Sequence, residues 1–464
     1  MITERLADLV ANHPSAEIPN DVYGAANDGV IDTLGVALAG TREPVAGILA
    51  AWVGEPGTRA EATVWGTSLA TSASNAAFAN GVSAHALDFD DSLPSGRGHM
   101  SACIVPTVLT LGEAIGAAGR EVLAAYAVGI EIAGALGRAF GPGHLKRGWH
   151  PTATIGTLAA TAAAARLAGL DAAGVAQAWG IAASQMSGLR RNFGTMTKPF
   201  HVGNAARTAV ASVSLAKRGL TADGVIFDGD GGVLATYGGG DGEPIEQILA
   251  TLVDPWDIVD PGNCVKRWPC CYSGHRTIAA LFDMIDKHGI AADDVEKITV
   301  SFLPGGDTAL LSTDPQTGLE GKFSIEYMAA AILLDGPLAM ATFTDPMVQR
   351  PEARRLMQKV RRIHIPDERF YSGMTGYNDI VVTTRTGRFE VREDRVPGSR
   401  GWPLSDKDRD DKFLDCATAA LHQTAAGDLL AVLKAMRSLD DVGSLTKATA
   451  PAKTATREAA PTPA

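Results

Sequence analysis

The segment 80–103 gathers acidic residues and histidines at a spacing that could move protons. Four ionisable side chains fall within seven residues: His85, Asp88, Asp90 and Asp91. His99 follows after a loop that contains proline and glycine. Imidazole titrates near neutral pH, and a nearby carboxylate stabilises its charged form. The segment therefore predicts a proton-transfer site, although an acidic helix end that runs into a solvated loop would give the same pattern.

A helix that continued through residues 85–91 would place His85, Asp88 and Asp91 on one face, because helical residues three apart are neighbours. The Asp88 carboxylate could then steady the charge of an imidazole. We expect Asp88 to orient His99, which titrates in the range that general acid–base catalysis requires at neutral pH.

Two later segments place basic or titratable side chains at predicted helix starts. In residues 143–156 glycines mark a loop and a proline opens an alanine-rich helix, so His150 lies at a helix N-terminus. Backbone N–H groups there attract anions and disfavour a protonated imidazole, although such a histidine can also lack any function. The loop 190–203 carries Lys198, His201 and two arginines before another helix. Basic side chains at this position predict a carboxylate-binding site.

A third polar group lies in the segment 264–281. Its basic and aromatic members are Lys266, Arg267, Tyr272, His275 and Arg276. Cys270 and Cys271 are adjacent and lack the separation that zinc or iron–sulfur ligands require. We therefore predict no metal site here.

Hydrophobic periodicity predicts helices over most of residues 1–265. The composition then changes, and the segments VEKITVSFL, VRRIHIP, DIVVTTRTG and RFEVREDRV alternate as strands do. Residues 266–395 are therefore predicted to form an α+β unit, and residues 396–445 to return to helix. The remaining segment, 446–464, is rich in alanine, threonine and proline and is predicted to be disordered.

Composition limits the classes of protein that fit. An apolar content of 46% and a charged content of 20% are typical of a globular protein with a large core. A net charge of −11 argues against nucleic-acid binding, which requires a basic surface. We recognise neither a signal peptide nor a charge-free run of about 18 residues, so no membrane segment is expected. The five cysteines indicate free thiols in a reducing compartment, and a cytoplasmic location is expected.

Three motifs resemble those of one known family. HALDFDDS with a histidine eight residues after its last aspartate, TKPFHVGNAA and KRWPCCYSGHR together resemble the MmgE/PrpD family. This family includes 2-methylcitrate dehydratases, cis-aconitate decarboxylases and iminodisuccinate epimerases. IDTLGVALAG near the start and KFLDCA near the end are also similar, so the resemblance covers about residues 1–445. One departure is that Met-Ser-Ala follows His99 where several members have Pro-Ser.

The resemblance implies a mainly α fold. A large helical domain would comprise residues 1–265 and 396–445, with a smaller α+β lid domain, 266–395, inserted between them. It also implies a homodimer that works without a metal or organic cofactor, with the active site between the domains. The catalytic residues that it implies are Asp88, His99, His150, Lys198 and Tyr327. It implies that Lys266 binds substrate, and the basic segments add His201, His275 and Arg276 as further substrate-binding candidates.

The reactions of this family place negative charge on a carbon beside a carboxylate, and cations positioned in advance stabilise that charge. We therefore expect a cofactor-free lyase that acts on a small di- or tricarboxylate, as a dehydratase or a decarboxylase. Two alternatives remain. One is an epimerase of an imino- or amino-dicarboxylate, which needs a proton carrier on each face of the carbon, and the other is a catalytically silent carboxylate-binding protein.

Overall fold

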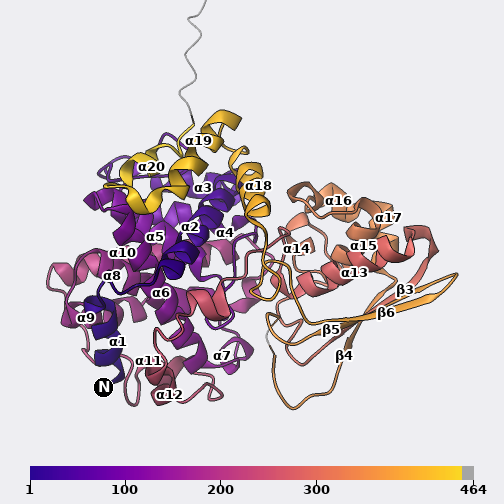
Figure 1. Cartoon of the computed structure of the whole chain (residues 1–464), viewed down its shortest axis with the longest axis horizontal. Coiled ribbons are helices and arrows are strands. Elements are labelled where there is room, and N and C mark those ends of the chain that lie inside the picture. The colour runs from indigo at the N-terminus through magenta and orange to yellow at the C-terminus, as the bar shows by residue number, and fades with distance from the viewer. Residues whose placement is uncertain (372, 452–464) are drawn as a thin grey trace, which may run out of the picture.

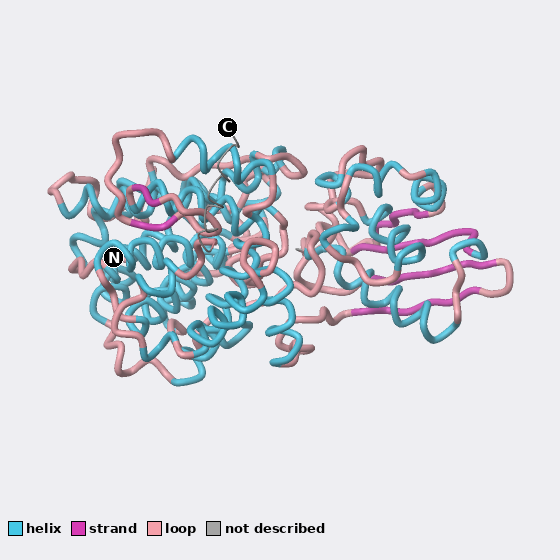
Figure 2. The backbone as a smooth tube through the Cα atoms, turned by 90° about the horizontal axis from the view of Figure 1, so that it is seen from above, coloured by secondary structure: helices cyan, strands magenta, loops and turns pink. Residues whose placement is uncertain are grey.

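The computed structural model describes residues 1–371 and 373–451 and is mainly helical, with a small mixed sheet (Figure 1). Two bodies lie side by side: a larger one of helices and a smaller one that contains the four-stranded sheet (Figure 2). The prediction of a mainly α protein is confirmed.

The helical body has one large apolar core, to which residues from Leu6 to Leu445 contribute, and smaller apolar clusters beside it. Its longer helices are α1 (Ile2–Asn12), α2 (Asn20–Gly40), α3 (Pro44–Val53), α4 (Ala73–Ala86), α5 (Met100–Ile115), α6 (Gly119–Phe140), α8 (Pro151–Leu167), α9 (Ala172–Ala183), α10 (Thr197–Lys217), α18 (Asp406–Ala417) and α19 (Gln423–Lys434). Short helices join them: α7 (Gly143–Lys146), α11 (Val233–Tyr237), α12 (Ile245–Ala250) and α20 (Gly443–Lys447). A two-stranded ribbon of β1 (Ala62–Thr63) and β2 (Ala70–Thr71) completes this body.

Small residues let α4 and α10 approach closely. A Cβ atom added to Gly81 would lie 2.8 Å from the Cα of Gly203, too close for any side chain at that position. This contact brings the start of α10, which carries Lys198, near the end of α4, which leads into the acidic segment.

Helix α6 is long and apolar enough to cross a membrane, and α2 with α3 would qualify together despite a bend of 92°. However, 89% of the apolar window of α6 is buried inside the helical body. The same burial is found for the central helix of a globular core, and α6 contributes much of the apolar core here.

The smaller body is an α+β unit with a second apolar core. Its strands are β3 (Val295–Phe302), β4 (Val360–His364), β5 (Asn378–Thr384) and β6 (Arg388–Glu393). They pair in the order β4-β3-β5-β6, with β3 and β4 parallel and the other pairs antiparallel. The helices are α13 (His275–His288), α14 (Gly318–Gly321), α15 (Ile325–Asp335), α16 (Asp345–Gln349) and α17 (Pro351–Met357).

The sheet of this unit is covered on one face. Alternate residues of β5 are buried, and they pack against α13 in the second core, to which α15 also contributes. This alternation is what a half-buried strand shows, and it confirms the strands predicted from their period of two. A hairpin joins β5 and β6, and in its turn the amide of Thr384 donates to the carbonyl of Gly387.

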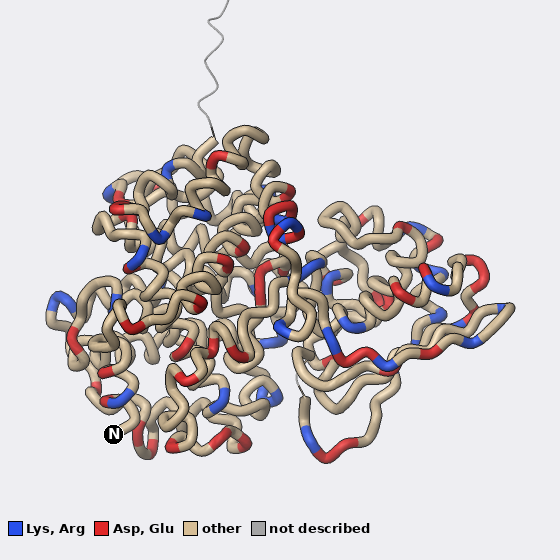
Figure 3. Tube along the Cα trace, viewed as in Figure 1, with Lys and Arg blue, Asp and Glu red and all other residues tan. Residues whose placement is uncertain are grey.

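Charges of both signs are interspersed on the two bodies, for example along α18 and on the outer hairpin of the sheet (Figure 3). Nucleic-acid-binding proteins instead gather basic side chains in a patch or stripe. The negative net charge is therefore distributed over a surface of mixed sign.

The predicted start of the disordered tail at residue 446 is too early. Helix α20 extends to Lys447, and the side chains of Thr446 and Thr449 are buried. The carbonyl of Thr449 also accepts a hydrogen bond of 3.1 Å from the amide of Gly66. Residues 452–464, the rest of the predicted tail, lie outside the described residues.

Truncation should reveal this docked end. We expect a chain that stops at Leu445 to melt at least about 2 °C below a chain that stops at Pro451, because only the shorter one loses the buried threonines and the Gly66 contact. Differential scanning calorimetry of both chains and the full-length protein measures this. Equal melting temperatures for the two truncated chains would contradict the prediction.

Candidate active site

The acidic segment is a loop rather than the continuation of a helix. Helix α4 ends at Ala86, and Asp88 has a φ of 53°, in the left-handed region that non-glycine residues rarely adopt. The expectation that His85, Asp88 and Asp91 share one helix face is therefore wrong. We call residues 87–91 the acid loop. Its turn directs successive aspartates to different partners.

Asp88 lies between two buried lysines. Its Oδ1 is 2.6 Å from Nζ of Lys198, and its Oδ2 is 3.2 Å from Nζ of Lys266. Burial by itself would raise the pKa of the Asp88 carboxyl, but the two lysines and the neighbouring histidines outweigh burial and lower the pKa below its ordinary value. Asp88 is therefore a carboxylate, and its negative charge holds both ammonium groups in the protein interior.

The position of Lys266 follows from a backbone bridge. Ser92, directly after the acid loop, and Cys264 exchange two backbone hydrogen bonds, of 2.7 and 3.0 Å. This antiparallel bridge fixes the segment that crosses toward the α+β unit beside the acid loop, so Lys266 also reaches the carbonyl of Asp88 at 2.6 Å.

The carboxylate of Asp90 contacts two histidines. Both of its carboxylate oxygens are 2.9 Å from Nδ1 of His85, and Oδ2 is 3.2 Å from Nδ1 of His99. Nε2 of His85 is 2.6 Å from Nζ of Lys198, so His85 accepts there and donates from Nδ1 to Asp90. Burial raises the pKa of Asp90, but the two histidines lower it well below its ordinary value.

The tautomer of His99 follows from its partners. Its Nδ1 is 2.9 Å from the carbonyl oxygen of Asp91, which can only accept, so Nδ1 carries the hydrogen. In the neutral ring Nε2 is then unprotonated, and it lies 3.8 Å from Oδ1 of Asp88. Asp90 and the Asp91 carbonyl thus orient His99, which corrects the expectation that Asp88 does so. Burial, followed by Lys266, lowers the pKa of His99.

His150 lies at the start of α8, as predicted, and contacts His201 from α10. The two Nδ1 atoms are 3.2 Å apart, so one ring donates to the other. Burial lowers the pKa of His201 to about 4 and that of His150 well below its ordinary value, which makes both rings neutral at pH 7.

A pocket opens on this cluster between the two bodies. Asp88, His99, His150 and Lys198 line one side of it. The α+β unit contributes Cys271, Tyr272, Ser273, Ala309, Phe323, Gly373 and Met374. The ring centroids of Phe193 and Phe323 lie 5.2 Å from Nζ of Lys198, so the ammonium lies between two aromatic rings and the Asp88 carboxylate. The pocket thus has an ionic side with proton carriers and an opposite side that is largely apolar.

Five predicted site residues do not line this pocket. Lys266 is fully buried behind Asp88 and acts on the pocket through that carboxylate. The hydroxyl of Tyr327 donates to the carbonyl of Thr342 at 2.5 Å, inside the core of the α+β unit. The position of Tyr327 therefore does not support its predicted catalytic role.

Two more belong to the start of α13. Arg276 donates to the backbone carbonyls of Gly373, Met374 and Asp394, so its guanidinium fastens a loop instead of facing a substrate. Burial lowers the pKa of His275 to about 3, and its Nε2 is 3.3 Å from the carbonyl of Cys270. Neither position supports substrate binding. His201 acts through His150 and does not line the pocket.

The acid-loop groups include a possible metal-ligand set. Ligand atoms of His85, Asp88, Asp90 and His99 all lie within 4.8 Å of one another. Two lysine ammonium groups already contact Asp88, and a metal cation would be repelled by them. The arrangement fits an ion pair network better than a metal centre.

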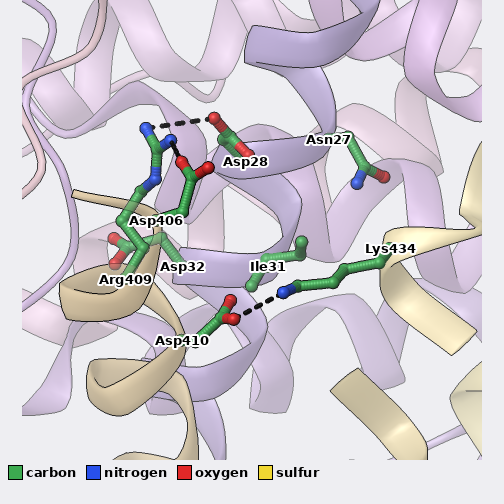
Figure 4. Close-up of a pocket in the computed structure, with 8 residues that line it drawn as sticks. All are labelled: Asn27, Asp28, Ile31, Asp32, Asp406, Arg409, Asp410 and Lys434. Carbon is green, nitrogen blue, oxygen red and sulfur yellow. Dashed lines mark hydrogen bonds and ion pairs between the residues drawn. The ribbon is translucent and has the colours of Figure 1, made fainter. Parts of the chain in front are cut away.

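A second hollow lies between α2, α18 and α19 (Figure 4). Its acidic side chains are partly paired already: Arg409 contacts Asp28 and Asp406, and Lys434 contacts Asp410. It contains no histidine, and its cations are engaged by these aspartates. The pocket at the acid loop is therefore the better candidate for an active site.

Comparison with known proteins agrees with this arrangement. Residues 4–245 match the MmgE/PrpD N-terminal domain, and residues 268–436 match the MmgE/PrpD C-terminal domain. The chain belongs to the MmgE/PrpD family. It is 29% identical to the human protein named cis-aconitate decarboxylase over 460 residues, which cover 96% of this chain and 94% of that protein. A mouse protein of the same name is also 29% identical, with 96% and 93% covered. An Aspergillus terreus cis-aconitate decarboxylase is 26% identical over 78% of each chain.

For this MmgE/PrpD member, the motifs predicted much of the ionic side of the pocket and little of the rest. Lys322 and Lys412, whose Nζ atoms contact the acid loop, were not predicted. Lys412 opens the KFLDCA segment, to which no chemical role was assigned, and Lys322 lies in none of the quoted motifs, so neither position predicted a contact with the acid loop. The same is true of Phe193 and Phe323, whose role depends on two segments meeting in space.

Proposed function

We propose that this chain is a cofactor-independent lyase that removes carbon dioxide from a small tricarboxylate of the cis-aconitate type. The observation that carries the proposal is the pocket at the acid loop, where the neutral Nε2 of His99 and the ammonium of Lys198 lie on one side. The resemblance over nearly the whole chain to proteins named cis-aconitate decarboxylase supports the choice of reaction.

The residues divide the reaction into charge stabilisation and proton transfer. Loss of carbon dioxide breaks a carbon–carbon bond and leaves its electron pair on the substrate, where a neighbouring double bond and carboxylate spread it. Lys198 can donate to that carboxylate, because only two of its N–H groups are directed at His85 and Asp88. In a buried pocket such a cation stabilises developing negative charge more strongly than in water.

His99 supplies the proton that completes the reaction. In the free protein its ring is neutral at pH 7, because burial lowers its pKa. A bound tricarboxylate adds negative charge beside the ring and favours the protonated form, which Asp90 also stabilises at 3.2 Å. The imidazolium then gives its Nε2 proton to carbon. The products are carbon dioxide and a five-carbon unsaturated dicarboxylate, which balances the six carbons of the substrate.

Nuclear magnetic resonance in D₂O tests the reaction class. Purified protein is incubated separately with cis-aconitate, citrate, 2-methylcitrate and iminodisuccinate, in buffer that contains EDTA and phenanthroline. We expect cis-aconitate to give a five-carbon dicarboxylate with one new C–D bond, despite the chelators. The variant Asp88→Asn, which removes the charge between the two lysines, is the control and should turn over at least about 100-fold more slowly.

The other outcomes would overturn the proposal in identifiable ways. Conversion of citrate or 2-methylcitrate to an alkene would identify a dehydratase. Exchange of deuterium into iminodisuccinate with inversion would identify an epimerase. Binding of these acids without turnover would indicate a silent carboxylate-binding protein, and activity restored only by one added metal would refute cofactor independence.

A further inference from the structure

Three consecutive carbonyl groups of the acid loop each accept a hydrogen bond from a lysine. Lys322 contacts the carbonyl of Leu87 at 2.5 Å, Lys266 that of Asp88 at 2.6 Å, and Lys412 that of Phe89 at 2.9 Å. These lysines come from three separate parts of the chain: the α+β unit after α14, the segment that joins the two bodies, and helix α18. The acid loop is thus the point where these three segments meet.

Two of these lysines have a carboxylate partner and one does not. Lys266 pairs with Asp88, and Lys412 pairs with Asp32 on α2 at 2.6 Å. Helix α18 itself is held on α2 by the pair of Arg409 with Asp28, which keeps Lys412 in place (Figure 4). Across residues 1–371 and 373–451, no carboxylate forms a salt bridge with Lys322. Lys322 is nevertheless buried, with only 4% of the residue exposed.

A buried ammonium without a counter-ion is costly, so its remaining contacts must offset the loss of water. The carbonyl of Leu87 follows the last turn of α4, where the helix dipole is negative and favours a cation. The surroundings of Lys322 disfavour its protonated form. Burial lowers the pKa of Lys322 to about 8, and Lys266 lowers it too, whereas Glu43, Asp88 and Cys270 raise it.

The contact has a geometric consequence for Asp88. This residue holds a left-handed φ of 53°, a backbone conformation that residues other than glycine rarely adopt. Lysines bind the carbonyl before Asp88, its own carbonyl and the carbonyl after it. Fixed carbonyls on both sides leave the backbone of Asp88 little freedom to relax.

We propose that Lys322 is a positioning residue that couples the seating of the α+β unit to the conformation of Asp88. Lys322 does not line the pocket, so it acts through the acid loop instead of touching substrate. The backbone of the same residue accepts a 3.0 Å hydrogen bond from the amide of Cys271, which does line the pocket. One residue of the α+β unit therefore holds both the acid loop and the opposite wall. The effect on turnover rests on the proposed function, but the structural coupling does not.

The test compares two variants with a matched control. Lys322→Met keeps the length of the side chain and removes the charge, whereas Lys322→Arg keeps a cation. Lys359→Met is the control, because Lys359 also lies in the α+β unit and donates to a carbonyl, that of Val295 at 2.6 Å, away from the acid loop. Amide hydrogen exchange of the peptide that covers residues 87–92, measured by mass spectrometry without substrate, is the first readout. Turnover of the substrate identified by magnetic resonance is the second.

We expect Lys322→Met to lower protection in residues 87–92 and turnover by at least about tenfold each. Lys322→Arg should recover part of both losses, and Lys359→Met should change neither. If Lys322→Met does not fold, Lys322→Gln takes its place, since its amide can still donate to Leu87. Wild-type protection in the methionine variant, or equal losses in the Lys359 control, would overturn the inference. If Lys322→Met lowers protection from hydrogen exchange but the wild-type protein converts none of the acids, only the proposed function is refuted and the structural coupling stands.

Discussion

Replacing Lys198 by methionine is expected to lower kcat/KM by at least about 1,000-fold, through both a higher KM and a lower kcat. Nζ of Lys198 is 2.6 Å from Oδ1 of Asp88 and 2.6 Å from Nε2 of His85, and it also lines the pocket. A cation that binds the substrate carboxylate contributes to the ground state and to the transition state, so both constants change. Steady-state kinetics on the identified substrate measure the split.

The same change should also destabilise the protein. Removing one partner of a buried pair leaves an uncompensated charge, a cost of about 3–5 kcal/mol where no other partner exists. Lys266 still pairs with Asp88 at 3.2 Å, so we expect a smaller loss. Lys217→Met is the matched control, because Lys217 lies on the same helix and reaches only the carbonyl of Ala168 at the surface. A folded Lys198 variant with a wild-type KM would show that the substrate carboxylate binds elsewhere.

Local sequence patterns were enough to predict the elements of the fold. Period-two alternation predicted the strands of the α+β unit, and the helical period predicted most of the larger body. The end of the chain was less predictable, because Thr446 and Thr449 are neither apolar nor periodic. Both are buried, and the carbonyl of Thr449 accepts from the amide of Gly66, a tertiary contact that no local pattern encodes. That the α+β unit acts as a lid domain remains a prediction.

The candidate site was predictable where one short segment supplies several groups. His99, Asp88 and Lys198 lie in motifs and meet in the pocket. Their partners were predicted less well, because the helix breaks at Ala86 and the left-handed Asp88 turns its carboxylate toward lysines from elsewhere in the chain. Orientation of His99 consequently depends on Asp90 and a backbone carbonyl.

Arg276 and Tyr327 show the opposite error. Both have side chains suited to binding or catalysis. In both, however, the polar group donates its hydrogen bonds to backbone carbonyls of the α+β unit. A residue type and a motif position predict what a side chain can do. Only the three-dimensional contacts show whether the hydrogen-bond donors of that side chain are already engaged by other groups of the protein.

The His99→Gln variant should separate proton transfer from binding. Glutamine can still donate to the carbonyl of Asp91, so the acid loop is expected to keep its shape, but an amide cannot deliver a proton at neutral pH. We expect kcat to fall by at least about 100-fold, with KM within about threefold of the wild type. His364→Gln is the matched control, since that histidine also lies beside an aspartate, Asp307 at 3.1 Å, but is 62% exposed.

The pH dependence of kcat/KM of the wild-type enzyme then shows whether His99 donates a proton to the substrate or removes one from it. Burial and Lys266 lower the pKa of His99 in the free protein below its ordinary 6.5. If the imidazolium gives a proton to carbon, kcat/KM falls about tenfold per pH unit as the pH rises above that lowered pKa, because the protonated fraction declines. His99→Gln should lose this slope. The opposite slope, with kcat/KM falling as the pH is lowered, would show that neutral Nε2 of His99 removes a proton from the substrate. Removal of a proton is the chemistry of a dehydratase or an epimerase, and it would contradict the decarboxylase proposed here.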